Sequence, residues 1–384
     1  MSGKRKRTPT IKSKTTTVLP TTAPNFPDIM LGTYRMKDMK VLNTVMNECL
    51  PVCRGLDTAA AYCNHGLIGK VGGTEEHWVQ TKLWRSVKSK DVVKKIRKDL
   101  KELKIKRLDC WLLHWPGPGR HLNFPPVTRT DIEVVGARDE GEESLVYEVD
   151  DVRARNKDDN DDDDYDDYDD NGGTELLVTK VMNENPSRVV KCPENWSPQT
   201  RLEVWSEMSK CVDLGLTRYL GACNFTLTQL RAVVEHCRAN NLHKPAVLQN
   251  EFHPYIKWDQ ELFDYCKDEG IRFQGHSCLG GGAAGGKVLL ENRVVGEIAK
   301  GLCVTAADVL FRYAHKKIGN VIVKSVRVER VLGAVEELRN PDWDIGAEDM
   351  RRLEGLAEGV ELVNFDDGVC LFSWLREFSP SRYD

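Results

Sequence analysis

The sequence predicts a closed parallel (β/α)₈ barrel, an α/β fold of the TIM-barrel class, and three observations support this. From about Pro27 onward, short apolar runs alternate with longer amphipathic ones, which is typical of repeated strand–helix units. Eight of the short runs are suitable strands, enough to close a barrel. A length of 384 residues accommodates one such barrel with insertions. An open doubly wound sheet is the competing architecture.

Each expected strand is a short apolar run, and several runs end in a polar residue. In chain order the strands are expected at Ile29–Thr33, Arg54–Thr58, Trp78–Trp84, Leu108–Trp115, Tyr219–Asn224, Val247–Phe252, Arg272–Ser277 and Val321–Ser325. The segments between them carry helical periodicity, for example at Asp91–Leu103, Arg201–Leu214, Leu227–Asn240, Asp259–Glu269 and Val304–Lys316.

Composition excludes several classes of function. A formal net charge of −4 gives no reason to expect nucleic acid as a partner, and no apolar stretch approaches the roughly 18 residues of a membrane span. The 12 cysteines include Cys110, Cys223 and Cys303 within apolar runs, and no C-x-x-C pair occurs. We therefore expect reduced, buried thiols in a reducing compartment, the cytoplasm, and no metal, with a disulfide framework or a metal site as the alternatives. The chain is also expected to be a monomer.

Two segments fall outside the strand–helix rhythm. Residues 1–26 begin with the basic run Lys4–Arg7 and are expected to form a disordered tail, with a weak nuclear or organellar address as the alternative. The barrel at 27–384 is expected to be interrupted after its fourth strand by a loop insertion at 120–197. Its acidic, low-complexity part at 156–173 cannot bury enough apolar surface to order. A calcium site is less suitable because the required spacing is missing.

Polar residues near the C-terminal ends of the expected strands form the pattern that points to a function. In a closed parallel barrel these ends meet at one rim, where the chemistry of such folds takes place. A single polar residue in an apolar run is usually a satisfied core group, whereas a set at one rim indicates a site. The set comprises Asp57, Lys82, His114, Asn224, Gln249, His276 and Lys324.

Tyr62 adds a phenol to this set, and the combination suits proton transfer. The reference pKa of a phenol, about 10, is too high for ready donation at neutral pH. An ammonium such as Lys82 is expected to lower that pKa, and Asp57 would keep the ammonium charged in a dry pocket. A neutral His114 could hold a substrate oxygen by a hydrogen bond. Together these groups favour protonation of a carbonyl oxygen while a hydride arrives.

Seven blocks of the sequence, in this order and spacing, resemble the signature blocks of the aldo-keto reductases. They are Leu31–Tyr34, Asp57–Asn64, Thr81–Trp84, Leu112–Pro116, Cys223–Phe225, Gln249–Tyr255, and Lys324-Ser325 with Arg330. The resemblance covers most of the chain from about Pro27 to Gly359, outside the acidic insertion.

The resemblance implies a role for each matching residue. Tyr62 resembles the general acid of the family, Lys82 and Asp57 the pair that tunes it, and His114 the residue that orients the carbonyl. The implied cofactor is NADPH, because Lys324 and Arg330 suit a 2′-phosphate. The implied cofactor contacts are Gly32, Thr33, Cys223, Asn224, Gln249, His276, Leu279, Lys324, Ser325 and Arg330, with Asn224 and Gln249 on the carboxamide. Tyr34, Trp84 and Trp115 are implied to line the substrate pocket.

Four positions depart from the pattern of the family, all at the expected cofactor site. Cys223 replaces a serine, and His276 replaces the aromatic ring that stacks on the nicotinamide. Val323 replaces a proline, and Ala334 lies where a polar contact to adenine is common. A thiol is a weaker hydrogen-bond donor and an imidazole a smaller stacking surface. These departures predict weaker cofactor binding, whereas the proton donor is intact.

A glycine-rich run at Gly280–Lys287 matches G-x-G-x-x-G, but no second strand–helix half-site supports a dinucleotide fold of that kind. In the resembling family this run is the loop that folds over the pyrophosphate. His65 and His77 lack metal-ligand spacing and are expected on the surface or in loops.

The predicted function is NADPH-dependent reduction of an aldehyde or ketone, a small-molecule carbonyl substrate, to an alcohol with Tyr62 as general acid. The alternatives are an NADPH-binding redox sensor with little turnover, and a phosphate-binding barrel of another chemistry.

Overall fold

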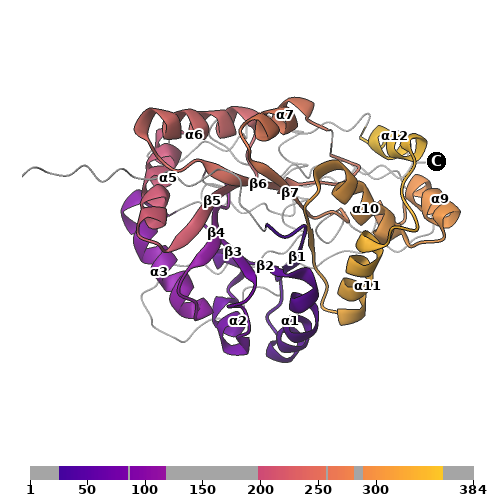
Figure 1. Ribbon diagram of the computed structural model, residues 1–384, viewed down its shortest axis with the longest axis horizontal. Coiled ribbons are helices and arrows are strands. Elements are labelled where there is room, and N and C mark those ends of the chain that lie inside the picture. Colours follow the sequence, from indigo (N-terminus) through magenta and orange to yellow (C-terminus); the bar gives the residue numbers. More distant parts are fainter. Residues whose placement is uncertain (1–25, 85–86, 118–197, 257, 281–288, 358–384) are drawn as a thin grey trace, which may run out of the picture.

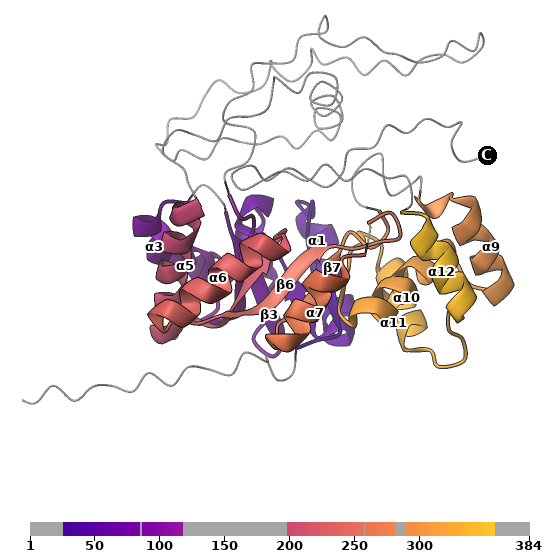
Figure 2. The same cartoon turned by 90° about the horizontal axis from the view of Figure 1, so that it is seen from above.

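The computed structural model describes residues 26–84, 87–117, 198–256, 258–280 and 289–357. Their strands form a closed barrel in the order β1 to β8, and every neighbouring pair is parallel. Figure 1 shows the strands at the centre with helices around them, and Figure 2 shows the same barrel from above. The predicted barrel is therefore confirmed, and the open doubly wound sheet is excluded.

The strands begin and end close to the expected positions. They are β1 (Ile29–Gly32), β2 (Gly55–Asp57), β3 (Trp78–Leu83), β4 (Leu108–Leu113), β5 (Thr217–Cys223), β6 (Pro245–Glu251), β7 (Arg272–His276) and β8 (Val321–Val323). Most are shorter at the C-terminal end than the apolar runs suggest, because the polar residues there leave the hydrogen-bonded ladder. Lys324 and Ser325, for example, follow β8 instead of closing it.

Helices on the outside of the barrel follow the strands. They are α1 (Met39–Cys53), α2 (His65–Val71), α3 (Val92–Leu103), α5 (Pro198–Asp213), α6 (Leu227–Asn240), α7 (Gln260–Asp268), α9 (Arg293–Leu302), α10 (Ala306–Ile318), α11 (Val328–Arg339) and α12 (Ala347–Gly355), with short 3-10 turns η1 (Ala60–Tyr62) and η2 (Ser89–Asp91). The helices named from periodicity occur within a few residues of their expected bounds.

Local signals explain where several helices begin. Asp38 caps α1 by accepting hydrogen bonds from the amides of Lys40 and Val41 at 2.8 and 2.9 Å. Thr226 and Thr305 begin α6 and α10 with capping boxes, in which side chain and backbone bond reciprocally. These caps fix the entry of each helix and so the direction in which the preceding strand end points.

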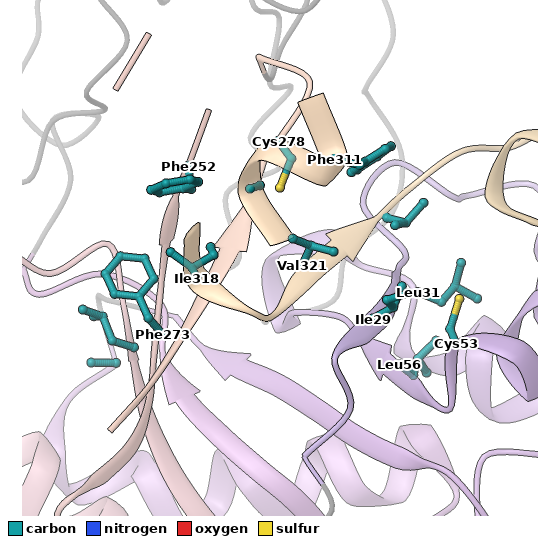
Figure 3. Packing of buried hydrophobic residues seen from close by; sticks show 14 of the residues in the cluster. Ile29, Leu31, Cys53, Leu56, Phe252, Phe273, Cys278, Phe311, Ile318 and Val321 are labelled. Atoms are coloured by element: carbon teal, nitrogen blue, oxygen red, sulfur yellow. The ribbon is translucent and has the colours of Figure 1, made fainter. Parts of the chain in front are cut away.

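Two apolar clusters lie on opposite sides of the strands. The larger one lies between strands and helices, and Figure 3 shows part of it, including Phe252, Ile318, Val321 and Leu56. The smaller one fills the inside of the barrel and comprises Phe26, Met30, Trp78, Cys110, Leu112, Cys223, Ala246, Val247 and Ile322. The interior is therefore packed like an ordinary core, as in other barrels of this class.

Several expectations fall outside the described residues. They concern the basic tail, the acidic insertion, the glycine-rich run beyond Gly280 and the segment after residue 357. Within the described part of the chain, no helix is both long and apolar enough to cross a membrane.

Candidate active site

The polar residues predicted at strand ends all occur at one rim of the barrel. Asp57 and His276 are the last residues of β2 and β7, and Lys82 lies one residue before the end of β3. His114, Asn224 and Lys324 directly follow β4, β5 and β8, and Gln249 lies within β6. Because all eight strands are parallel, these positions share the C-terminal face.

Lys82, Asp57 and Tyr62 form a connected group. The Lys82 Nζ donates to Asp57 Oδ2 at 2.7 Å, to the carbonyl oxygen of Thr58 at 3.1 Å, and to Tyr62 Oη at 3.4 Å. The side chains of Lys82 and Asp57 are only 1% and 5% exposed. Burial alone would lower the pKa of Lys82, but the adjacent carboxylate outweighs burial and raises it. Lys82 is therefore a buried cation.

The expected effect of Lys82 on Tyr62 is present but is not the dominant one. Burial raises the pKa of Tyr62 to about 12, although the ammonium of Lys82 opposes that rise. The expectation of a lowered phenol pKa is therefore wrong for this structure. Asp57 explains part of the difference, because its negative charge also raises the pKa of the phenol.

Aromatic rings lie next to Tyr62 and His114 at the rim. The ring centroid of Tyr34 lies 5.0 Å from that of Tyr62, and His114 lies edge-on to Tyr62 at 6.1 Å. Trp84 and Trp115 contact His114 at 5.5 and 5.9 Å. The three residues expected at the substrate pocket thus lie next to Tyr62 or His114, and their rings give this part of the rim an aromatic wall.

A chain of hydrogen bonds connects β5 and β7 at the rim. Asn224 Nδ2 donates to the carbonyl oxygen of His114 at 3.1 Å, which leaves Asn224 Oδ1 facing His276 Nε2 at 3.0 Å. His276 Nε2 must therefore carry the proton, and Nδ1 accepts from Ser277 Oγ at 3.0 Å. Burial, with the charge of Lys82, lowers the pKa of His276 to about 4. The imidazole is neutral.

Backbone strain is concentrated at the same rim. Arg35, Cys63, Asn224 and Ser277 have φ values of 59°, 51°, 64° and 55°, in the left-handed region that favours glycine. Other residues with positive φ, such as Arg54 and Lys104, end helices, where this conformation is common. Cys63 likewise ends the 3-10 turn η1. Arg35, Asn224 and Ser277 end no helix, and strained residues of that kind often mark functional sites.

Thr33 and Gly32 support the site from β1. Thr33 donates through its amide and its Oγ1 to the carbonyl oxygen of Asp57 at 3.0 and 3.1 Å. Gly32 lies so close to β8 that a Cβ atom would come within 2.8 Å of Ile322 Cγ2. Thr33 is fully buried. In the protein alone it therefore anchors the end of β2.

Basic residues lie at the ends of β1 and β8. Arg35 lies over the ring of Tyr34 at 5.2 Å. Partial burial and the charge of Arg35 together lower the pKa of Lys324. Arg330, on the first turn of α11, is exposed. The Ser325 side chain forms a local hydrogen bond, because its Oγ accepts from the amide of Arg327 at 3.1 Å. Neighbouring cations at a rim favour an anionic ligand.

The remaining residues predicted to contact the cofactor are Gln249, Cys223 and Leu279, and they lie deeper in the protein than Lys324 and Arg330. Gln249 is 1% exposed and donates to Asp57 Oδ1 at 2.9 Å and to Gln274 Oε1 at 2.7 Å. Cys223 Sγ is 3.5 Å from Gln249 Oε1. Leu279 follows β7 and packs against the larger apolar cluster. In the protein alone, Gln249 therefore bonds to the interior of the barrel.

Two expectations about individual residues are wrong. His65 is buried rather than on the surface, and its Nε2 lies 2.9 Å from Thr81 Oγ1 while its Nδ1 lies 3.4 Å from Asp99 Oδ1. Cys303 is exposed because it adopts the left-handed conformation that ends α9. Sequence reasoning did not assign a role to Arg35, Asn64, Gln80 or Gln274. Of these four, only Arg35 had a signal that could have been used, because it directly follows Tyr34 at a strand end.

The described residues contain no group of three or more His, Cys, Asp or Glu side chains placed to hold a metal ion. The groups they bring together are a phenol, a buried ammonium–carboxylate pair, aromatic rings and a cationic edge. This arrangement suits the transfer of a proton to a polar atom inside an aromatic pocket.

Comparison with known proteins gives consistent results. A model of the aldo/keto reductase family matches residues 29–357. The (1S)-1,7-diacetoxy-luvungin A aldo-keto reductase of Citrus sinensis is 36% identical over 169 residues, which cover 43% of this chain but only 50% of that protein. The NADPH-dependent codeinone reductase 1-1 of Papaver somniferum is 25% identical over 318 residues, 79% of this chain and 77% of that protein. The aldose reductase of Schistosoma japonicum has a TM-score of 0.58 at 24% identity and covers 88% of this chain and 91% of that one.

Proposed function

Because this chain belongs to the aldo/keto reductase family, we propose that it reduces an aldehyde or ketone to an alcohol, with NADPH as the hydride donor and Tyr62 as the proton donor. The observation that carries the proposal is the Tyr62 hydroxyl group within 3.4 Å of a buried ammonium, inside an aromatic wall. A half-buried phenol with a pKa of about 12 is protonated at neutral pH, so the donor form predominates.

In this proposal each residue has one task. Tyr62 gives its proton to the carbonyl oxygen, and Lys82 stabilises the phenolate that remains. Asp57 keeps Lys82 charged. His114 orients the carbonyl, and Tyr34, Trp84 and Trp115 exclude water from the pocket. Flat, apolar carbonyl compounds suit such a wall better than hydrated sugars.

The described residues fit NADPH at two places. Lys324 and Arg330 would hold the 2′-phosphate, and Arg35 adds a cation that favours the same anionic ligand. The neutral imidazole of His276 offers a flat face at the rim, supported by Asn224 and Ser277. When bound, the dihydronicotinamide supplies the hydride. The name of the poppy relative, an NADPH-dependent reductase, supports this choice of cofactor.

The test is the oxidation of NADPH by the purified chain with a panel of aromatic aldehydes, ketones and quinones. Tyr62→Phe should lower kcat by roughly 10²- to 10⁴-fold, the typical contribution of a positioned acid, and should change the dissociation constant of NADPH little. Tyr265→Phe, which removes a phenol from α7 on the outside of the barrel, is the matched control. Unchanged turnover in Tyr62→Phe would show that another group is the acid.

The same experiment addresses the second candidate, an NADPH-binding redox sensor, which the replacements at Cys223 and His276 motivate. A sensor would bind NADPH and turn over no faster than Tyr62→Phe. The complete group of Asp57, Tyr62 and Lys82 favours the enzyme, because a sensor has no need of a proton donor.

A further inference from the structure

Three glutamines and Asp57 form a closed ring of hydrogen bonds inside the barrel, directly below Lys82. Gln80 Nε2 donates to Asp57 Oδ1 at 2.6 Å and to Gln274 Oε1 at 2.8 Å. Gln249 Nε2 donates to the same two oxygens at 2.9 and 2.7 Å. The ring joins β2, β3, β6 and β7 across the interior, and its three glutamine side chains are at most 1% exposed.

The orientation of the amides follows from the carboxylate. Asp57 is paired with Lys82 and accepts hydrogen bonds only, so both neighbouring amides must present their nitrogen atoms to it. Each NH₂ group then has one remaining proton, and both remaining protons point to Gln274 Oε1. Gln274 in turn donates to Met30 Sδ at 2.9 Å, which fixes its own orientation. This orientation gives each amide hydrogen of Gln80 and Gln249 an acceptor, whereas Gln80 Oε1 is buried without a hydrogen-bond partner among the described residues.

The ring gives Asp57 two neutral donors in addition to the ammonium. Hydrogen bonds to the charged form of a carboxyl group stabilise that form, and they count for more in an interior from which water is excluded. They also hold Oδ1 toward the centre of the barrel, so that Oδ2 remains directed at Lys82 Nζ. Without them the Asp57 side chain would rely on its contact with Lys82, and Lys82 could settle away from Tyr62.

We propose that Gln80 and Gln274 are positioning residues, which hold the Asp57 side chain in the orientation that keeps the Lys82 ammonium within reach of Tyr62. Gln80 acts directly through Asp57 Oδ1, and Gln274 acts by aligning Gln80 and Gln249. Both amide protons of Gln249 belong to the ring, so in the protein alone it serves the carboxylate. This inference rests on the proposed function of Tyr62 and extends it to the interior of the barrel.

Substitutions at Gln80 separate positioning from packing. Gln80→Leu removes the donor at similar size, and kcat should fall roughly 10- to 100-fold, the range for a lost hydrogen bond to a charged group. Gln80→Glu retains a donor only while the introduced carboxyl group is protonated. Burial and the charge of Asp57 should raise the pKa of that group, so kcat should approach the wild-type value at acid pH and fall as the pH rises. Gln274→Leu should give a smaller loss than Gln80→Leu.

Besides Asp57 in the ring itself, other titratable groups lie around it, and these substitutions retain all of them. They are Tyr62, Lys82, Cys110, Cys223 and His276. The wild-type profile therefore provides the reference for their effects. Asn320→Ala is the control for the loss of a buried amide, because Asn320 lies near the opposite end of the barrel and donates to the carbonyl oxygen of Pro27 at 3.2 Å.

A second measurement needs neither substrate nor cofactor. The NH₃⁺ resonance of Lys82, assigned by its absence in Lys82→Met, should move in Gln80→Leu and stay in place in Asn320→Ala. An unchanged Lys82 resonance in Gln80→Leu would overturn the proposal. So would a loss of kcat in Gln80→Glu that is the same at every pH, because it would indicate an effect of packing alone. If the wild-type protein reduces no carbonyl compound, the proposed function fails, and the resonance still decides whether the ring positions Lys82.

Discussion

Replacing Lys82 by methionine should destabilise the protein as well as inactivate it. Lys82 and Asp57 are 1% and 5% exposed and 2.7 Å apart. Removing one partner of a buried ion pair typically costs about 3–5 kcal/mol, because the other charge remains buried without compensation. Asp57 would keep the two amide donors of the ring. We therefore expect the lower part of that range, about 3 kcal/mol.

The reasoning depends on the unpaired carboxylate, so removing its charge should recover part of the loss. In Lys82→Met with Asp57→Asn, the two losses should be non-additive by roughly 1–3 kcal/mol. The measurement is the free energy of unfolding in urea for the wild type, both single variants and the double variant. The exposed pair of Arg231 and Glu261, 2.8 Å apart, is the control and should couple by less than about 1 kcal/mol. Additive losses at Lys82 and Asp57 would refute the reasoning.

Three further predictions concern the cofactor edge and the dependence of stability on pH. Lys324→Ala and Arg330→Ala should each raise the dissociation constant of NADPH by roughly 10- to 100-fold and leave that of NADH unchanged in a fluorescence titration; equal effects on both would remove the 2′-phosphate assignment. The pKa of His276 is lowered from 6.5 to about 4, so stability is lost as the pH falls through that window. In His276→Phe the free energy of unfolding should decline less as the pH falls. Urea midpoints that fall equally with pH in the variant and the wild type would contradict this. Burial raises the pKa of Cys266 from 9.0 to about 12, so stability should be complete below pH 9 and decline from there toward pH 12. Cys266→Ala should reduce the slope of this decline in stability with pH, whereas Cys63→Ser, at an exposed thiol, should leave it unchanged. Equal slopes in the two variants would oppose this account.

Periodicity and strand-end chemistry were sufficient to predict the barrel and the rim. Strands alternate with amphipathic helices in an order that a parallel barrel requires, and parallel strands place Asp57, Lys82 and His114 at one face whatever the loops do. The resemblance to a family added the roles of these residues, which remain proposals.

The interior ring could not be predicted from the sequence. Gln80 and Gln274 are separated by 194 residues and lie within apolar runs, where a single polar residue carries no signal of its partner. His65 is expected on the surface or in a loop because it lacks metal-ligand spacing, whereas tertiary contacts with Thr81 and Asp99 bury it. The pKa of Tyr62 required the extent of burial, which depends on how Trp84, Trp115 and His114 pack. Sequence identifies the charges in a site but not how much water remains around them.

The proton on Tyr62 is retained by burial, and this predicts a difference between the two directions of the reaction. Lys82 Nζ lies 2.7 Å from Asp57 Oδ2 and 3.4 Å from Tyr62 Oη. The nearby carboxylate therefore offsets much of the stabilisation that the ammonium would give to the phenolate. Reduction of a carbonyl needs the phenol, which predominates at every pH well below 12. Oxidation of the alcohol needs the phenolate as base, and its fraction grows about tenfold per pH unit below the pKa. The kcat for carbonyl reduction should therefore stay nearly constant from neutral to mildly alkaline pH, while kcat for alcohol oxidation rises. A flat oxidation profile over the same range would mean that the ammonium, rather than burial, controls the phenol.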